Sequence, residues 1–182
     1  MTFEKTVTLK DGRNCLLRNG VTSDGKVVLD VFNRTHEETD YLLTYLDENC
    51  FTASQEADFL QRKTDSTNTV EIIAIVDGVV AGTAGIDALG MRDKIKHRAV
   101  FGIAITKEFW GLGIGKSLME ACIECAREAG YLQLELEVVA ENERAVEMYR
   151  RAGFIEYGRN PKAFRLRTGE YQELIDMRLE LK

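Results

Sequence analysis

Residues 103–115 read Ile103-Ala104-Ile105-Thr106-Lys107-Glu108-Phe109-Trp110-Gly111-Leu112-Gly113-Ile114-Gly115, and they carry the main structural signal of the chain. An apolar segment typical of a strand leads into three alternating glycines, after which a helical pattern begins. Glycines permit backbone angles and close approaches that side chains forbid. Because the first amides of a helix have no partner within it, this turn predicts a site for an anion such as a pyrophosphate. Lys116, in the first turn of the helix, adds positive charge there.

The spacing of these glycines disfavours two nucleotide-binding motifs. A Walker A loop requires Gly-x4-Gly-Lys-Ser/Thr, and Gly115-Lys116-Ser117 matches only its end, because Trp110 stands where the first glycine is required. A dinucleotide fingerprint requires Gly-x-Gly-x-x-Gly after the first strand of a βαβ unit. Here the spacing is Gly-x-Gly-x-Gly, and it follows a predicted meander of three strands.

Length and composition predict one domain spanning residues 1–182. The chain is 45% hydrophobic and 30% charged, which is close to the average for globular proteins. Its net charge of −6 gives no support to nucleic-acid binding, which usually requires a basic face. No apolar run is long enough to span a bilayer, and the N-terminus lacks the apolar stretch of a signal peptide. We therefore expect a cytoplasmic protein with neither a nucleic acid nor a membrane as partner.

The remaining pattern predicts a mixed α/β sheet covered by helices. Asp77-Gly78 between two β-branched runs is a strong hairpin signal, and Gly130 is a helix stop. Strands are expected over 13–18, 70–76, 79–86, 99–105 and 132–139 and near 154–160 and 171–180, and helices over 22–32, from 54 through 60, and over 114–129 and 142–152.

No metal site is expected. Cys122 and Cys125 form a C-x2-C pair on the predicted helix 114–129, but the chain has no second pair and no histidine nearby. Because a zinc site needs about four ligands, helix packing is the favoured role of these thiols.

Two motifs resemble those of the GNAT superfamily of acyl-CoA N-acyltransferases. The family's cofactor motif is Arg/Gln-x-x-Gly-x-Gly/Ala after an apolar strand, and its glycines correspond to Gly113 and Gly115, while Trp110 replaces the usual Arg or Gln. A second family pattern runs Leu-Glu-Val-x-x-x-Asn-x-x-Ala-x-x-x-Tyr-x-x-x-Gly-Phe. This chain matches it without insertion at Leu136-Glu137-Val138, Asn142, Ala145, Tyr149 and Gly153-Phe154. The resemblance extends from about residue 70 to the C-terminus.

The resemblance implies an acetyl-CoA-dependent N-acetyltransferase without a metal. It also implies an α/β (α+β) fold with a mixed, mostly antiparallel central sheet of about six to seven strands and helices on both faces. Ile103 and Ile105 are expected to offer backbone groups to the pantetheine arm, as a peptide adds to a sheet edge. The full set of residues expected to bind the cofactor is Ile103, Ile105, Trp110, Gly111, Leu112, Gly113, Ile114, Gly115, Lys116, Asn142 and Tyr149.

Two residues receive catalytic roles from the resemblance. Tyr149 is the expected acid for the departing thiolate, because a phenol of reference pKa near 10 can donate its proton to it. Glu137 is the expected base for the attacking ammonium. Glu135 lies two residues earlier on the same face of the strand and is an alternative base, and His97 is a more distant one.

The acceptor stays open between several classes. A small-molecule amine or amino acid is preferred, a protein N-terminus or lysine is the alternative, and a sensor that binds acyl-CoA without turnover is a third hypothesis. The retained Tyr149 and Asn142 argue against the sensor. By resemblance, segments 36–53, 89–98 and 159–170 are expected to border the acceptor site. The oligomeric state is open, and a homodimer is one alternative.

Overall fold

The computed structural model describes residues 1–181, which form one continuous eight-stranded sheet in the order β1-β2-β3-β4-β5-β6-β8-β7. Every neighbouring pair is antiparallel except β5 and β6. The predicted mixed, mostly antiparallel sheet is therefore confirmed, but with eight strands instead of six to seven. The strands are β1 (Glu4–Thr8), β2 (Asn14–Asn19), β3 (Val70–Val76), β4 (Val79–Ala88), β5 (Arg98–Ile105), β6 (Gln133–Val139), β7 (Ile155–Arg165) and β8 (Tyr171–Glu180).

The two edges of the sheet differ from the predicted pattern. β1 was not predicted, because it pairs only with β2 and every residue in it except Val7 is exposed, so it lacks an alternating apolar face. β7 runs beyond the predicted 154–160 and includes Pro161. Proline is tolerated there because β7 is an edge strand, and its pairing with β8 is interrupted by two register shifts.

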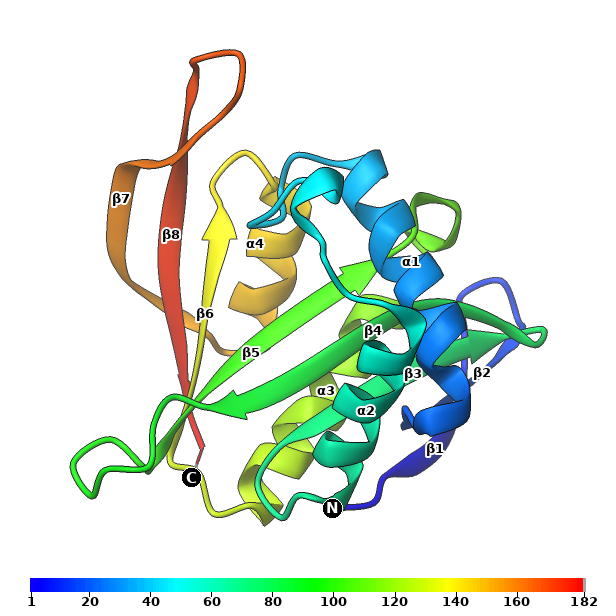
Figure 1. Cartoon of the computed structure of the whole chain (residues 1–182). Coiled ribbons are helices and arrows are strands. Elements are labelled where there is room, and N and C mark those ends of the chain that lie inside the picture. The colour runs from blue at the N-terminus through cyan, green and yellow to red at the C-terminus, as the bar shows by residue number, and fades with distance from the viewer. Residues whose placement is uncertain (182) are drawn as a thin grey trace.

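Helices cover both faces of the sheet, as predicted and as Figure 1 shows. On one face lie α1 (Gly25–Glu38) and α2 (Ala53–Asp65), and on the other lie α3 (Ile114–Glu128) and α4 (Glu143–Arg151). Across the described residues, no helix has the length and apolar character that crossing a bilayer requires.

The alternation of β3 separates two hydrophobic cores. Ile73 packs with Val28 of α1 and Leu60 of α2, whereas its neighbour Ile72 joins the larger core with Leu118 of α3. Cys122 and Cys125 lie fully buried in this larger core, so the predicted packing role is confirmed.

β5 and β6 run parallel but separate soon after they meet. Their pairing covers only Arg98 to Val100 against Gln133 to Glu135. Beyond this point the two strands diverge toward their C-terminal ends, as Figure 1 shows. The sheet therefore opens in its middle, just before the glycine turn that joins β5 to α3.

Candidate active site

The glycine turn has the backbone geometry that its sequence predicts. Gly111 and Gly113 adopt φ angles of +89° and +98°, which favour glycine, and Gly113 directly precedes α3. The first hydrogen bond of the helix runs from the Ser117 amide to the Gly113 carbonyl. The amides of residues 113–116 therefore have no partner within the helix and form an anion site at its positive end.

Gly115 is favoured for a different reason, which is close packing. A Cβ at this position would lie 3.1 Å from Sδ of Met148 and 3.4 Å from Cδ1 of Ile105. Met148 belongs to α4 and Ile105 to β5, so the absence of a side chain lets α3 begin between these two elements.

A cleft of about 950 Å³ occupies the opening between β5 and β6. Every residue predicted to bind the cofactor lines it except Leu112. Leu112 instead packs against the larger core, and its carbonyl accepts the Lys10 amide at 3.1 Å. The contact of Leu112 with the cofactor therefore stays a prediction, and its side chain is not part of the cleft lining.

The backbone of β5 turns alternate residues toward the opening. The Arg98 carbonyl accepts from Leu89, and the Thr106 amide donates to Ala81, so the even-numbered residues of β5 face β4. Because successive backbone groups on a strand point to opposite edges, those of Ile103 and Ile105 face the cleft. The Ile105 carbonyl already accepts the indole N–H of Trp110 at 2.7 Å.

Three basic residues of the cleft, Lys10, Arg144 and Arg151, were not singled out from the sequence. Arg144, in the first turn of α4, stands over the Trp110 ring with its Cζ 5.8 Å from the ring centroid. Lys10 lies beside Gly113, where its Cγ would be 3.9 Å from an added Cβ. The only sequence signal for Arg144 was its place two residues after Asn142, because its position near the glycine turn depends on how α4 packs.

Tyr149 is buried in α4 and lines the cleft. Its ring lies edge-on to Phe101 of β5, at 6.1 Å between centroids, and 5.8 Å from the ring of Phe154. Burial raises the pKa of this phenol well above its ordinary value, because the charged form loses its hydration. The hydroxyl therefore keeps its proton throughout the neutral range.

Asn142 lines the same cleft and begins α4. Its side-chain oxygen accepts the amide of Ala145 at 3.3 Å, which is the capping interaction expected of this residue type.

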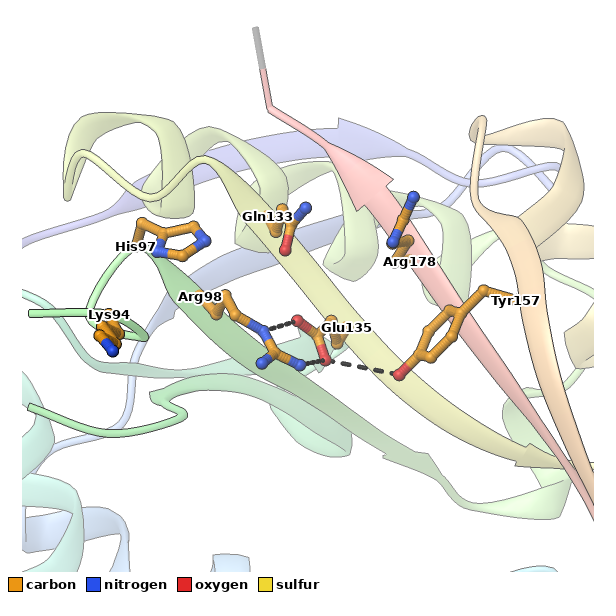
Figure 2. Close-up of a pocket in the computed structure, with 7 residues that line it drawn as sticks. All are labelled: Lys94, His97, Arg98, Gln133, Glu135, Tyr157 and Arg178. Atoms are coloured by element: carbon orange, nitrogen blue, oxygen red, sulfur yellow. Dashed lines mark hydrogen bonds and ion pairs between the residues drawn. The ribbon is translucent and has the colours of Figure 1, made fainter. Parts of the chain in front are cut away.

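The two glutamates of β6 have different environments. Glu137 is exposed and lines the cleft. Glu135 is buried in a separate recess of about 310 Å³, where Arg98 holds both of its oxygens and Tyr157 lies 3.5 Å away, as Figure 2 shows. His97 lines that recess and not the cleft. Neither alternative base, Glu135 or His97, therefore lines the cleft. Glu135 would also have to break its pair with Arg98 in order to accept a proton.

Two of the three segments expected to border the acceptor site meet at the cleft. Tyr41 and Leu43, from the connection between α1 and α2, line it together with Phe164 of β7. The tip of the β7–β8 hairpin is fixed to that connection, because Arg167 bonds Asp47 at 2.7 Å. The segment 89–98 instead contributes to the recess around Arg98 and adds no residue to the cleft lining, so its place beside the acceptor stays a prediction.

Two basic residues of the hairpin, Arg159 and Arg167, are neutralised by neighbours. Arg159 bonds Glu156 at 2.9 Å and Glu173 at 3.2 Å, and Arg167 is paired as described above. Within residues 1–181, no cluster of three or more His, Cys, Asp or Glu side chains is placed to hold a metal ion.

Comparison with known proteins gives a consistent result. The family model described as the acetyltransferase (GNAT) family matches residues 32–154. The L-amino acid N-acetyltransferase AaaT of Escherichia coli (strain K12) is 32% identical over 118 residues, which are 64% of this chain and 72% of that protein.

Solved structures share the fold. A GNAT-family acetyltransferase from Streptococcus pneumoniae superposes with a TM-score of 0.87 at 28% identity, over 91% of this chain and 99% of that one. The yncA protein of Salmonella typhimurium, solved with its cofactor acetyl-CoA, has a TM-score of 0.82 at 16% identity, over 93% and 95% of the two chains.

Proposed function

Because the chain belongs to the acetyltransferase (GNAT) family and is an N-acetyltransferase that uses acetyl-CoA, we propose that it acetylates a small-molecule primary amine or amino acid by direct attack on the thioester. The observation that carries this proposal is the cleft between the diverging β5 and β6, which joins the glycine turn to Tyr41 and Phe164. It offers an anion site, an open strand edge and a separate mouth for the acceptor.

The cofactor would lie along the open edge of β5. Its pyrophosphate accepts hydrogen bonds from the free amides at the start of α3. Its pantetheine arm bonds the backbone of Ile103, in the manner of an added strand. Since the Ile105 carbonyl already holds Trp110, Ile103 is the stronger of the two predicted contacts. The side-chain amide group of Asn142 stays available to pantetheine, because the cap uses only its oxygen.

Tyr149 serves as the acid in this proposal. When the tetrahedral intermediate collapses, the carbon–sulfur bond breaks and the coenzyme A thiolate takes the phenolic proton. The phenol is protonated at neutral pH, as a proton donor must be, and the burial that raises its pKa also disfavours the phenolate that remains after the transfer. The position of Tyr149 against Phe101 supports it as well, since Phe101 is the first β5 residue beyond the pairing with β6.

Glu137 serves as the base, directly or through water. Successive side chains of a strand point to opposite faces, so Glu137 extends from the face opposite to the buried Leu136 and Val138. Tyr149 approaches from the other face, where it contacts Phe101. The amine therefore attacks from the Glu137 side, and the thiolate leaves toward Tyr149.

The class of acceptor rests on the relative and on charge. AaaT is named an L-amino acid N-acetyltransferase, and this chain shares 32% of its residues over the matched region. Glu137 provides a negative charge for an ammonium group, and the apolar side chains of Leu43 and Phe164 suit an uncharged body. An α-carboxylate would need a cation, and Arg165, the last residue of β7 beside the hairpin tip, has no ion-pair partner among residues 1–181.

A thiol-release assay with acetyl-CoA tests this proposal. Free amino acids, simple primary amines and peptides with free N-termini are compared at equal concentration. We expect the highest kcat/KM for a free amino acid or small amine. A preference for peptides by more than tenfold would instead support the protein N-terminal alternative. If none of the acceptors were acetylated, the sensor would be supported.

A further inference from the structure

The glycine turn lacks the Arg or Gln side chain that is usual at the first position of the motif. Trp110 stands there, and its indole N–H is already used by the Ile105 carbonyl at 2.7 Å. Trp110 therefore has no side-chain donor left for a phosphate, and its indole carries no charge. A pyrophosphate carries two negative charges, and backbone amides alone leave them without a counter-ion.

Arg144 reaches this position from another element. A Cβ added to Gly111 would lie 3.6 Å from Nη2 of Arg144, so the guanidinium borders the turn itself. Its Cζ stands 5.8 Å from the centroid of the Trp110 ring. A guanidinium over an aromatic face is attracted by the negative charge of that face and loses orientational freedom.

Among the cationic side chains that line the cleft, Arg144 is free of a carboxylate partner within residues 1–181 and can therefore pair with a phosphate. Arg151 of the same helix bonds Glu147 at 2.7 Å, and Lys116 lies 3.5 Å from Glu120. In the part of the chain that the structure describes, Arg144 forms no ion pair with any carboxylate. Lys10 is likewise unpaired there, but it flanks Gly113 on the other side of the turn.

We propose that Arg144, held over the Trp110 ring, binds the pyrophosphate of acetyl-CoA in place of the Arg or Gln that the family's motif carries at position 110. This inference rests on the proposed function, because it requires the cofactor to lie at the start of α3. A planar guanidinium can give two parallel hydrogen bonds to phosphate oxygens, which an ammonium cannot. Trp110 acts as the platform that aims this fork, and it binds no phosphate itself.

Titration calorimetry of Arg144→Ala with coenzyme A and with dephospho-coenzyme A tests the proposal. The second ligand keeps the pyrophosphate and lacks the 3′-phosphate. We expect the dissociation constant to rise about tenfold for both ligands, as for loss of one charged hydrogen-bonding group. In steady-state kinetics the KM for acetyl-CoA should rise by a similar factor, while kcat at saturation stays within about twofold.

Arg127→Ala is the matched control, because Arg127 is an exposed arginine at the opposite end of α3. It removes the same charge and should leave both dissociation constants unchanged. Arg144→Lys keeps the charge and should fall between the wild type and Arg144→Ala.

Two results would overturn the inference. Equal affinity of Arg144→Ala and wild type would exclude a phosphate contact, and a loss confined to coenzyme A would assign Arg144 to the 3′-phosphate. If the wild type itself bound neither ligand, the proposed function would fail instead, so the two failures are distinguishable.

Discussion

Tyr149 of α4 lies edge-on to Phe101 of β5, with the ring planes at 84° and the centroids 6.1 Å apart. Phe101 follows directly after the last β5 residue that pairs with β6, so this contact marks the point at which the sheet opens. A buried phenol, that of Tyr149, and an exposed carboxylate, that of Glu137, thereby line the same cleft. The proposed acid and base reach the reaction from opposite faces of the sheet.

Tyr149→Phe should lower kcat by about 100-fold, because the thiolate loses its proton donor. The KM for acetyl-CoA should change little, since the ring and its contacts with Phe101 and Phe154 remain. Steady-state kinetics with a thiol-trapping reagent measure both constants. A kcat within twofold of the wild type would show that another group protonates the thiolate.

The raised pKa of Tyr149 predicts a specific effect at high pH. Burial disfavours the phenolate, so the folded protein holds this proton at a pH where the unfolded chain has released it. Stability from this group is therefore unaffected below about pH 10, the reference pKa, and falls as the pH rises further. Denaturant unfolding at pH 9 and pH 11 should show a larger loss for the wild type than for Tyr149→Phe. Equal losses would contradict the burial argument.

Glu137→Gln should lower kcat by about 100-fold and flatten its increase with pH, because the amide cannot accept the proton of the ammonium. Glu135→Gln is the matched control on the same strand. It weakens the pair with Arg98 and should lower the free energy of unfolding by about 1 kcal/mol, with kcat nearly unchanged. Should Glu135→Gln be the variant that loses turnover, the base would have to be sought in the recess of Figure 2.

Gly113→Ala and Gly130→Ala separate backbone strain from cofactor binding. Both glycines lie at ends of α3 with positive φ, +98° and +81°. Each substitution should cost about 1–2 kcal/mol of stability, measured by thermal unfolding. Only Gly113→Ala should also weaken acetyl-CoA binding, because Gly113 lines the cleft. A similar loss of affinity in both variants would mean that the turn does not contact the cofactor.

The sequence predicted the elements whose patterns are local. The glycine turn, the hairpin at Asp77-Gly78 and the helix that follows Gly113 depend on backbone conformations that particular residues favour. β1 escaped because an exposed edge strand has no apolar periodicity. The extension of β7 escaped because Pro161 normally ends a strand, and only its edge position permits it.

The site was predicted less completely, because several of its features join distant segments. Glu135 and Glu137 lie two residues apart on the same face of one strand, so the sequence pattern does not distinguish them. The parallel pairing of β5 with β6 is what brings Arg98 to Glu135. Arg144 reaches Gly111 only because α4 packs beside the turn. The separation of segment 89–98 from the cleft likewise follows from the direction of β5.

Amide hydrogen exchange with and without acetyl-CoA tests the central claim most directly, because it locates the cofactor residue by residue. The account predicts slower exchange at the amides of residues 113–116 and at Ile103, with no change around Arg98 and Glu135. Unchanged exchange at the glycine turn, or protection confined to the recess around Arg98, would contradict it.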